Sequence, residues 1–139
     1  MDCPIVYGPL PSRRFGFSLG INLLPENRKQ CNFDCLYCQC GWTDRNLLQA
    51  RVESVGFPSL SDLEVSIHKE FERLHQEGIA PDTIVFSGNG EPTLYPEFFR
   101  AVELVRLARN DYLPSSLLGI LTNGTMLGEK VIFNAVAGL

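Results

Sequence analysis

The 139-residue sequence contains few histidine, methionine and tryptophan residues: two, two and one respectively. No apolar run approaches the length of a membrane span, and the first residues lack the basic start and apolar core of a secretory signal. Internal repeats and low-complexity tracts are also absent from the sequence. We therefore expect a cytoplasmic protein without a membrane partner, and the sequence excludes a repeat architecture.

Basic side chains are fewer than acidic ones, 12 against 16, which gives a net charge of −4. A dedicated nucleic-acid surface usually carries a basic patch, so this balance argues mildly against one. The first 60 residues are slightly basic, which leaves room for an RNA contact there. In this half, the pair Arg13-Arg14 suits either a solvated surface or an anion contact.

With 45% hydrophobic residues, the chain is able to bury one core.

Cysteine is plentiful, because five are present and four of them lie between residues 31 and 40. An odd total, with four cysteines crowded into one segment, is not typical of a disulfide framework, so we expect reduced thiols or metal ligands. Cys31, Cys35 and Cys38 form the pattern C-x3-C-x2-C, which offers three soft ligands to one metal centre. Three thiolates leave one position of a tetrahedral site, or one iron of a 4Fe-4S cluster, open to an outside molecule.

Two other interpretations of these cysteines stay open. The first is a zinc-stabilised interaction module, although structural zinc sites usually take ligands from two knuckles and this sequence has one. The second is an iron–sulfur electron carrier whose cluster is completed by Cys40. Cys40 lies too near Cys38 to reach the opposite corner of a cluster easily, and a carrier does not explain the Gly-Glu pair at residues 90–91.

The cysteine segment, with Tyr37 before its last cysteine, closely resembles the signature of the radical S-adenosylmethionine (radical SAM) enzymes. The resemblance implies that Cys31, Cys35 and Cys38 hold three irons of a 4Fe-4S cluster. It also implies that S-adenosylmethionine (SAM) chelates the fourth iron and that Tyr37 flanks its adenine. The surrounding sequence resembles the branch of the family that includes the wyosine-base-forming tRNA enzymes. The segments that carry this resemblance are Tyr7-Gly8-Pro9, Ser12-Arg13-Arg14 and Gly20-Ile21-Asn22.

A second polar motif, Gly88-Asn89-Gly90-Glu91, follows the apolar run at residues 82–87, which we predict to be a buried strand. Glycines let the backbone approach a ligand, and a carboxylate suits an ammonium group, although a turn before a helix explains the same residues. The motif resembles the family's Gly-Gly-Glu site for the SAM amino group, which implies cofactor contacts for Asn89, Gly90 and Glu91. Asn89 replaces the family's first glycine, and asparagine also tolerates positive φ.

A third polar ending, Thr122-Asn123-Gly124, follows the strand predicted at residues 117–121. It resembles the family's third strand ending, which implies a cofactor contact for Asn123. A common Asn-Gly turn explains these residues without a ligand.

The remaining pattern predicts one α/β domain of parallel strands. Residues 1–17 form a lead-in, residues 18–40 hold the first strand and the cysteine loop, and residues 41–139 hold further β/α units. We expect an excursion at residues 39–58 in which Trp42 packs. Helices are predicted at residues 61–77, where Ser61 begins a capping-box pattern, from Pro96 to Asn110-Asp111, and at residues 129–137. Helical spacing predicts that their buried residues are Leu63, Ile67, Phe71 and Leu74 in the first helix, Phe98, Val102, Val105 and Ala108 in the second, and Val131, Ile132, Ala135 and Val136 in the third. Each parallel strand is joined to the next by a connection that contains a helix, and such crossover connections are expected to be right-handed. The resemblance implies the N-terminal half, about three β/α units, of a (β/α) TIM-like barrel.

The resemblance predicts an oxidoreductase that cleaves SAM reductively to a 5′-deoxyadenosyl radical, which abstracts a hydrogen from a substrate. It implies an electron donor such as flavodoxin or ferredoxin, and no catalytic group beyond the cluster and SAM. The substrate is not encoded in these motifs, and tRNA is one candidate. Because about half of the family's barrel is counted here, we expect a fragment, or a chain that a partner completes, and an incomplete catalyst.

Overall fold

The computed structural model describes residues 2–44 and 56–139, so the excursion predicted at residues 39–58 lies partly outside these ranges. The fold is mixed α/β, as predicted. In chain order its elements are β1 (Val6–Ser12), β2 (Gly16–Ile21), α2 (Leu60–Gln76), β3 (Thr83–Phe86), the 3-10 helix η1 (Pro92–Leu94), α3 (Phe98–Tyr112), β4 (Leu117–Ile120) and α4 (Lys130–Ala137).

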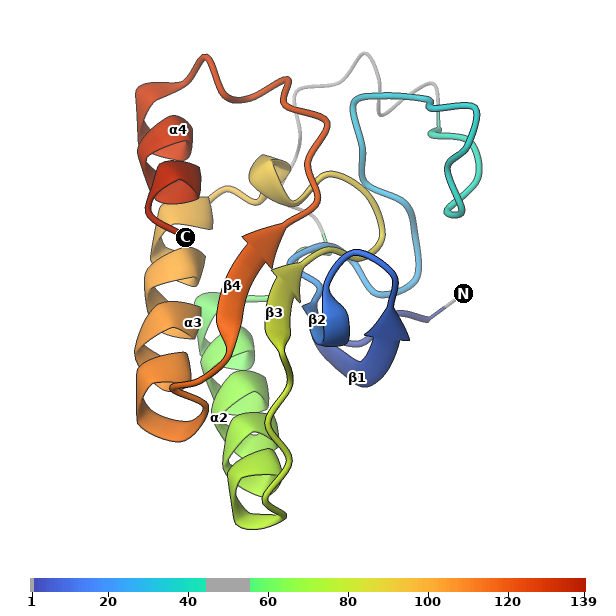
Figure 1. The fold of residues 1–139 in the computed structure, drawn as a ribbon. Coiled ribbons are helices and arrows are strands. Elements are labelled where there is room, and N and C mark those ends of the chain that lie inside the picture. The colour runs from blue at the N-terminus through green and yellow to red at the C-terminus, as the bar shows by residue number, and fades with distance from the viewer. Residues whose placement is uncertain (1, 45–55) are drawn as a thin grey trace.

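The four strands form one sheet in the order β1-β2-β3-β4 (Figure 1). β2, β3 and β4 are parallel, as the strand-helix alternation predicts, while β1 is antiparallel to β2. β1 was not predicted, because Gly8, Pro9 and Pro11 are typical of turns. Gly8 has a φ of 96° and lies where the β1–β2 register shifts. It therefore makes an irregularity within a strand, where the sequence pattern indicated a loop.

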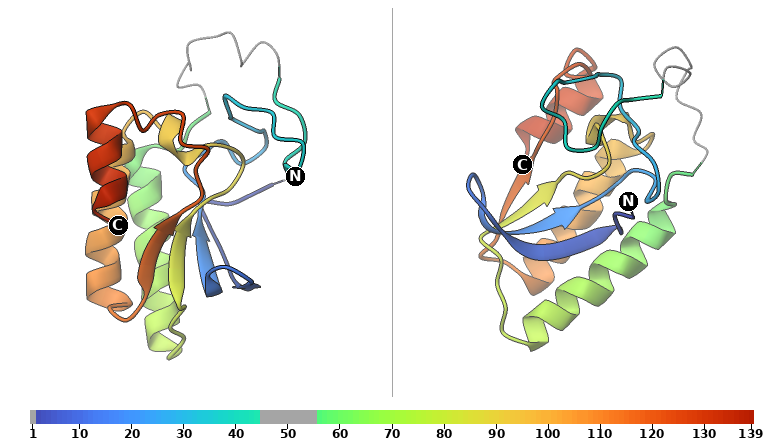
Figure 2. Two further views of the ribbon diagram at one scale, coloured as in Figure 1. Left: turned by 45° about the horizontal axis from the view of Figure 1, so that its top comes forward. Right: turned by 90° about the vertical axis from the view of Figure 1, so that its right-hand side faces the viewer.

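One face of the sheet packs against α2 and α3, which lie side by side (Figures 1 and 2). On that face Leu19 of β2 lies beside Ile84 of β3, and both are fully buried. The helical residues predicted to face the core are buried in the same cluster: Leu63, Ile67, Phe71 and Leu74 of α2 and Phe98, Val102, Val105 and Ala108 of α3. No helix among the described residues has the length and apolarity to cross a membrane.

Three details of the helices differ from the prediction. α3 begins at Phe98, two residues after the predicted start at Pro96. Ser59, not Ser61, caps α2: its hydroxyl accepts from the Asp62 backbone N–H at 3.1 Å, and the Asp62 carboxylate accepts from the Ser59 N–H at 3.1 Å. In α4, Val131 was predicted to face inward but is 62% exposed, whereas Ala135 is buried. The reason is that α4 packs mainly on α3, so only one side of this short helix is covered.

The other face of the sheet, here called the inner face, has small residues in its middle row, where Gly20, Val85 and Gly119 are neighbours. Aromatic rings from the β1–β2 hairpin lie over the two glycines. The Tyr7 ring occupies the space that a side chain at Gly20 would need, because a Cβ there would lie 2.1 Å from it, while a Cβ on Gly119 would be in ordinary contact with the Phe15 ring at 3.4 Å. The hairpin therefore partly covers the inner face.

β4 is an edge strand among the described residues, because β3 is its only neighbour there. Leu117 is 69% exposed and Leu121, just after the strand, is 43% exposed. This edge thus presents apolar side chains and one row of backbone groups for further pairing.

Candidate functional site

The three predicted motifs follow the C-terminal ends of the three parallel strands. The cysteine segment comes after β2, the Gly88–Glu91 segment after β3, and Thr122-Asn123-Gly124 after β4. Figure 1 shows these connections at the same end of the sheet, with the cysteine segment in cyan and teal. Strand ends of this kind are where α/β proteins usually place ligands and reactive groups.

The motifs enclose a cavity of about 360 Å³, which we call the thiol cavity. Of the predicted site residues, it is lined by Cys31, Cys35, Tyr37, Cys38, Gly90, Glu91 and Asn123. Asn89 is the one predicted residue that does not line it. The fold therefore brings residues from three separate connections around one space.

The cysteine segment is folded around the ammonium group of Lys29, whose side chain is 6% exposed. Lys29 Nζ donates to the Gly41 carbonyl at 2.7 Å and to Asp34 Oδ1 at 3.4 Å. The same Asp34 oxygen accepts from the Thr43 backbone N–H at 2.6 Å, and Thr43 Oγ1 donates to the Phe33 carbonyl at 2.8 Å. These bonds join the start, middle and end of the segment, so the thiols lie on a closed loop.

Lys29 also affects the charge of the thiols. Burial raises the pKa of Cys31, against the lowering effects of the Phe33 backbone hydrogen bond and of the Lys29 ammonium. Burial by itself lowers the pKa of Lys29, but the neighbouring Cys38 thiol and Asp34 carboxylate raise it above its ordinary value. A positive charge is thus held beside groups that must become thiolates to bind a metal.

Three thiols are the protein ligands that an open 4Fe-4S cluster takes, each thiolate binding a different iron. All five cysteines are free of disulfides, and Cys31, Cys35 and Cys38 are half-buried around one cavity. Within residues 2–44 and 56–139, no group of three or more His, Cys, Asp or Glu side chains is gathered tightly enough to hold a single metal ion. The donor set fits the chemistry of a cluster, whose ligands need not converge on one point.

The residue before the first cysteine is joined to the glycine-rich motif through the backbone. Gln30 and Gly90 form an isolated parallel bridge. The Gln30 N–H donates to the Asn89 carbonyl at 2.8 Å, and the Glu91 N–H donates to the Gln30 carbonyl at 3.0 Å. Gly90 has a φ of 143°, and a Cβ there would lie 1.9 Å from the Gln30 carbonyl oxygen. Only glycine permits this approach without a shift of the backbone.

We expect Gly90→Ala to lower the free energy of unfolding by about 2 kcal/mol or more, because overpacking and positive-φ strain act together. Chemical denaturation of the metal-free chain measures this loss. Gly128→Ala is the matched control, because a Cβ at Gly128 meets no atom within 4 Å and its φ is not in the left-handed region. Equal stability of the two variants would show that the Gln30–Gly90 contact is not as close as described.

Asn89 turns its side chain away from the thiol cavity. Its Nδ2 donates to the Pro25 carbonyl at 3.0 Å and to the Glu26 carbonyl at 2.7 Å, and its backbone N–H donates to Asn22 Oδ1 at 3.3 Å. No non-glycine residue among those described has positive φ, so Asn89 does not use the backbone tolerance considered from the sequence. It ties the β3 ending to the chain that leaves β2.

Glu91 is buried, with only 2% of its surface exposed, and hydrogen bonds hold its carboxylate in one orientation. Its Oε1 accepts from the Thr93 N–H at 3.2 Å, from Thr93 Oγ1 at 2.5 Å and from Thr122 Oγ1 at 2.7 Å. Among the residues that the structure describes, its Oε2 accepts only from the Asn123 N–H, at 2.6 Å. Of the two oxygens, Oε2 therefore has more capacity to accept a further donor from the cavity.

Asn123 connects the β4 ending to the cysteine segment. Its Nδ2 donates to Asn32 Oδ1 at 2.9 Å and lies 3.9 Å from Cys31 Sγ. Its Oδ1 accepts from the Thr125 N–H at 3.0 Å, which is the local turn bond considered from the sequence. The residue thus forms both a turn and a contact beside the first thiol.

Two aromatic side chains of the cysteine segment project into solvent. Tyr37 is 87% exposed, and a hydrogen bond to Cys35 raises its pKa. Trp42 is 73% exposed, so the expectation that it packs is wrong. Its segment leaves the sheet, and Lys29 rather than an apolar side chain fills the inside of the loop.

Lys29 was missed by the sequence interpretation, and Arg14, which lines the thiol cavity, was left undecided. A basic residue two positions before three clustered thiols is the signal for Lys29, because thiolates favour a nearby cation. Nothing in the sequence pattern places Arg14 beside the cysteines, because that contact depends on how the β1–β2 hairpin folds.

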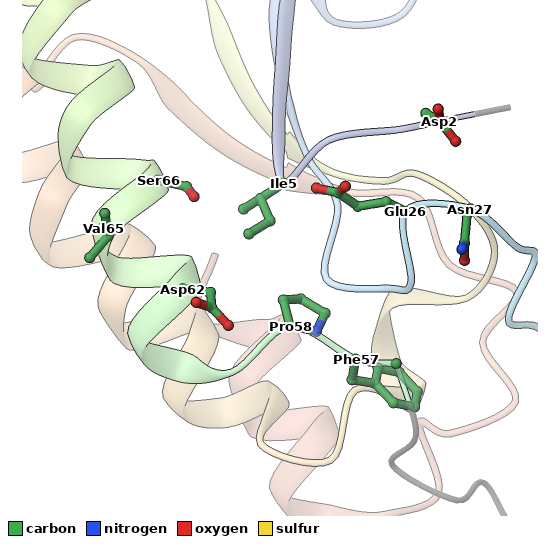
Figure 3. Close-up of a pocket in the computed structure, with 10 residues that line it drawn as sticks. Asp2, Ile5, Glu26, Asn27, Phe57, Pro58, Asp62, Val65 and Ser66 are labelled. Atoms are coloured by element: carbon green, nitrogen blue, oxygen red, sulfur yellow. The ribbon is translucent and has the colours of Figure 1, made fainter.

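A larger cavity of about 750 Å³ lies away from the thiols, at the start of α2. Figure 3 shows that Asp2, Glu26 and Asp62 contribute carboxylates to its wall, together with the apolar Ile5, Phe57 and Val65. Asp62 is already engaged in the cap of α2. None of the residues that line this cavity belongs to the three motifs. Its larger volume is therefore not by itself a reason to place the functional site there.

Comparisons with known proteins match the chain to one family. The model of the Radical SAM superfamily matches residues 29–137, which contain all three motifs. A UPF0026 protein of Helicobacter pylori is 34% identical over 133 residues, covering 96% of this chain and 39% of the relative. A UPF0026 protein of Methanocaldococcus jannaschii is 35% identical over 133 residues, covering 95% and 37%. The chain thus spans about two fifths of these relatives, and no solved structure matches it.

Proposed function

Because the chain belongs to the radical SAM superfamily, we propose that Cys31, Cys35 and Cys38 bind three irons of a 4Fe-4S cluster and that SAM binds the open iron. The observation that carries this proposal is that the three thiols share one 360 Å³ cavity with Gly90 and Glu91. When bound, the cluster supplies an electron that cleaves SAM and leaves a 5′-deoxyadenosyl radical, which abstracts a substrate hydrogen.

Glu91 binds the amino group of SAM through its carboxylate. Four hydrogen bonds fix that carboxylate before the ligand arrives, so little side-chain entropy is lost on binding. Burial of Glu91 strengthens a charge-assisted bond to an ammonium, because the local dielectric is low. The backbone of Gly90 allows the cysteine segment and Glu91 to approach the same ligand.

The other predicted residues orient the ligand. Tyr37, exposed at the cavity wall, offers a ring to the adenine, and Asn123 presents its side chain between Glu91 and Cys31. Asn89 supports the site from behind through the Pro25 and Glu26 carbonyls. Lys29 holds the cysteine segment closed and offsets the charge of its thiolates.

In a longer protein of this family, the chain forms the N-terminal part of a (β/α) barrel. Its three parallel strands, the helices on one face and the open edge of β4 support that placement. The electron donor is a flavodoxin or ferredoxin, and the setting is the cytoplasm, where thiols stay reduced. The similarity to the wyosine branch makes tRNA modification one candidate reaction for the whole protein.

Anaerobic reconstitution with iron and sulfide, followed by SAM and dithionite, tests the proposal. We expect 5′-deoxyadenosine and methionine in equal amounts, measured by mass spectrometry. Because the chain spans only part of its relatives, turnover should stay below ~1 s⁻¹, the lower end of the range usual for enzymes. A chain with all three cysteines replaced by alanine is the control and should form neither product.

Two other outcomes identify the rival functions. A reducible cluster without SAM cleavage would indicate an electron carrier. One observation favours this alternative, because Cys40 also lines the thiol cavity and could supply a fourth ligand. Its Sγ already donates to the Gly88 carbonyl at 3.5 Å. Tightly held zinc with no cluster formed indicates a zinc-stabilised module.

A further inference from the structure

A second cavity, of about 380 Å³, lies on the inner face of the sheet beside the thiol cavity. We call it the inner cavity. Gln39, Ser87 and Leu121 line both cavities, so the two spaces share a wall. A ligand in the inner cavity is therefore adjacent to a ligand bound by the thiols and Glu91.

The inner cavity combines an apolar surface with neutral hydrogen-bonding groups. Val85, Leu121 and Phe15 supply apolar surface, while Ser12, Ser18 and Gln39 add two hydroxyls and an amide. The hydroxyls of Tyr7 and Ser87 also line it and lie 2.6 Å apart. None of the residues that line it carries a charge. Its volume lies within the ~300–1,000 Å³ typical of small-molecule sites.

Arg14 lines the thiol cavity and is next in the chain to Phe15, which lines the inner cavity. Its backbone N–H donates at 3.3 Å to the hydroxyl of Ser12, another residue that lines the inner cavity. The arginines Arg73, Arg100 and Arg106 are each paired with a glutamate on or next to their own helix. Among the described residues, no carboxylate forms an ion pair with Arg14. Its guanidinium is therefore available to a ligand.

We propose that the inner cavity is the substrate site and that Arg14 recognises an anionic group, a carboxylate or phosphate, on a compact organic substrate. The assignment as a substrate site rests on the proposed function, while the anion-binding property does not. A guanidinium forms paired, charge-assisted hydrogen bonds with both of these anions. The apolar body of the substrate lies over Val85 and Leu121, with its polar groups toward Tyr7 and Ser87.

The proposal is tested by titrating the full chain with phenyl phosphate and, as the uncharged counterpart, with benzyl alcohol. Each titration is made on the anaerobically reconstituted chain and on the metal-free chain. We expect saturable amide shifts at Gly20, Val85 and Ser87 in nitrogen-15 NMR spectra with phenyl phosphate only. Arg14→Gln should weaken binding by about tenfold or more, the usual cost of one charge-assisted hydrogen bond. Arg14→Lys keeps the charge and should weaken binding less, and Arg13→Gln is the matched control because Arg13 lines neither cavity.

Several results would overturn the proposal. These are an absence of saturable binding, equal binding of benzyl alcohol, unchanged affinity in Arg14→Gln, or amide shifts confined to other parts of the chain. If Arg14→Gln weakens SAM as strongly as phenyl phosphate, Arg14 belongs to the SAM site and the assignment is also wrong. Binding to the metal-free chain with no cluster formed on reconstitution would contradict the proposed function while leaving the anion site in place.

Discussion

Alanine at Cys31, Cys35 or Cys38 is expected to abolish the cluster absorbance near ~420 nm, because in the proposed site each thiolate would be the protein ligand of one iron. Cys40→Ala should retain it, since the Cys40 thiol donates instead to the Gly88 carbonyl. Anaerobic reconstitution followed by absorbance, iron and sulfide assays makes this comparison. The predicted pattern is total loss in three variants and near-normal loading in the fourth.

Cys3→Ala provides a second control, because Cys3 lies in the lead-in before β1 and its Sγ is 3.9 Å from the neighbouring Pro4 carbonyl. It should load iron like the unmodified chain. Loss of iron from Cys40→Ala with retention in Cys35→Ala would reveal a different ligand set. That result would also favour an electron carrier over a site with an open iron.

Replacing Glu91 with glutamine is expected to weaken SAM binding roughly 10- to 150-fold, or ~1.5 to 3 kcal/mol, without loss of iron. The carboxylate oxygens accept from Thr93, Thr122 and the Asn123 N–H, so an amide must also turn one N–H toward a donor. Calorimetry with SAM on the reconstituted chain measures the affinity. Iron content in the same sample shows whether the cluster is intact.

Thr122→Val separates the two roles of this carboxylate, because it removes one donor to Glu91 and leaves the charge. If the charge binds SAM, this variant should lose much less affinity than Glu91→Gln. If the two variants lose the same amount, Glu91 acts by bracing the β4 ending. An affinity unchanged in Glu91→Gln would remove Glu91 from the SAM site.

The parallel strands and main helices could be predicted because their signals are local. β3 is a short run of β-branched and aromatic residues that are all buried, and the helical spacing of Leu63, Ile67, Phe71 and Leu74 marks the buried face of α2. β1 could not be predicted in this way, because its turn-forming residues are accommodated by pairing with β2. The cap of α2 was misplaced by two residues because Ser59 and Ser61 both precede an acidic residue three positions later.

The thiols and Glu91 could be located because their spacing is itself the signal. The groups that hold them in place depend on contacts between distant segments. Lys29 reaches Gly41 only after the loop closes, and Asn89 reaches Glu26 only after β2 and β3 pair. The position of Arg14 depends in turn on the hairpin that lays Tyr7 over Gly20. Apart from the position of Lys29 two residues before Cys31, none of these contacts has a period or spacing that can be recognised in the chain.

The parallel bridge between Gln30 and Gly90 has a consequence for how this site tolerates mutation over evolution. The offset between the first thiol and the carboxylate of Glu91 is set by main-chain hydrogen bonds, which every residue except proline is able to make. The exposed side chains of Phe33 and Leu36 are thus free to diversify around a fixed spacing between Cys31 and Glu91. Substitutions at Gly90 are not, because a Cβ would push the two segments apart. We therefore expect lineages to vary the surface around the thiols while this single backbone contact persists.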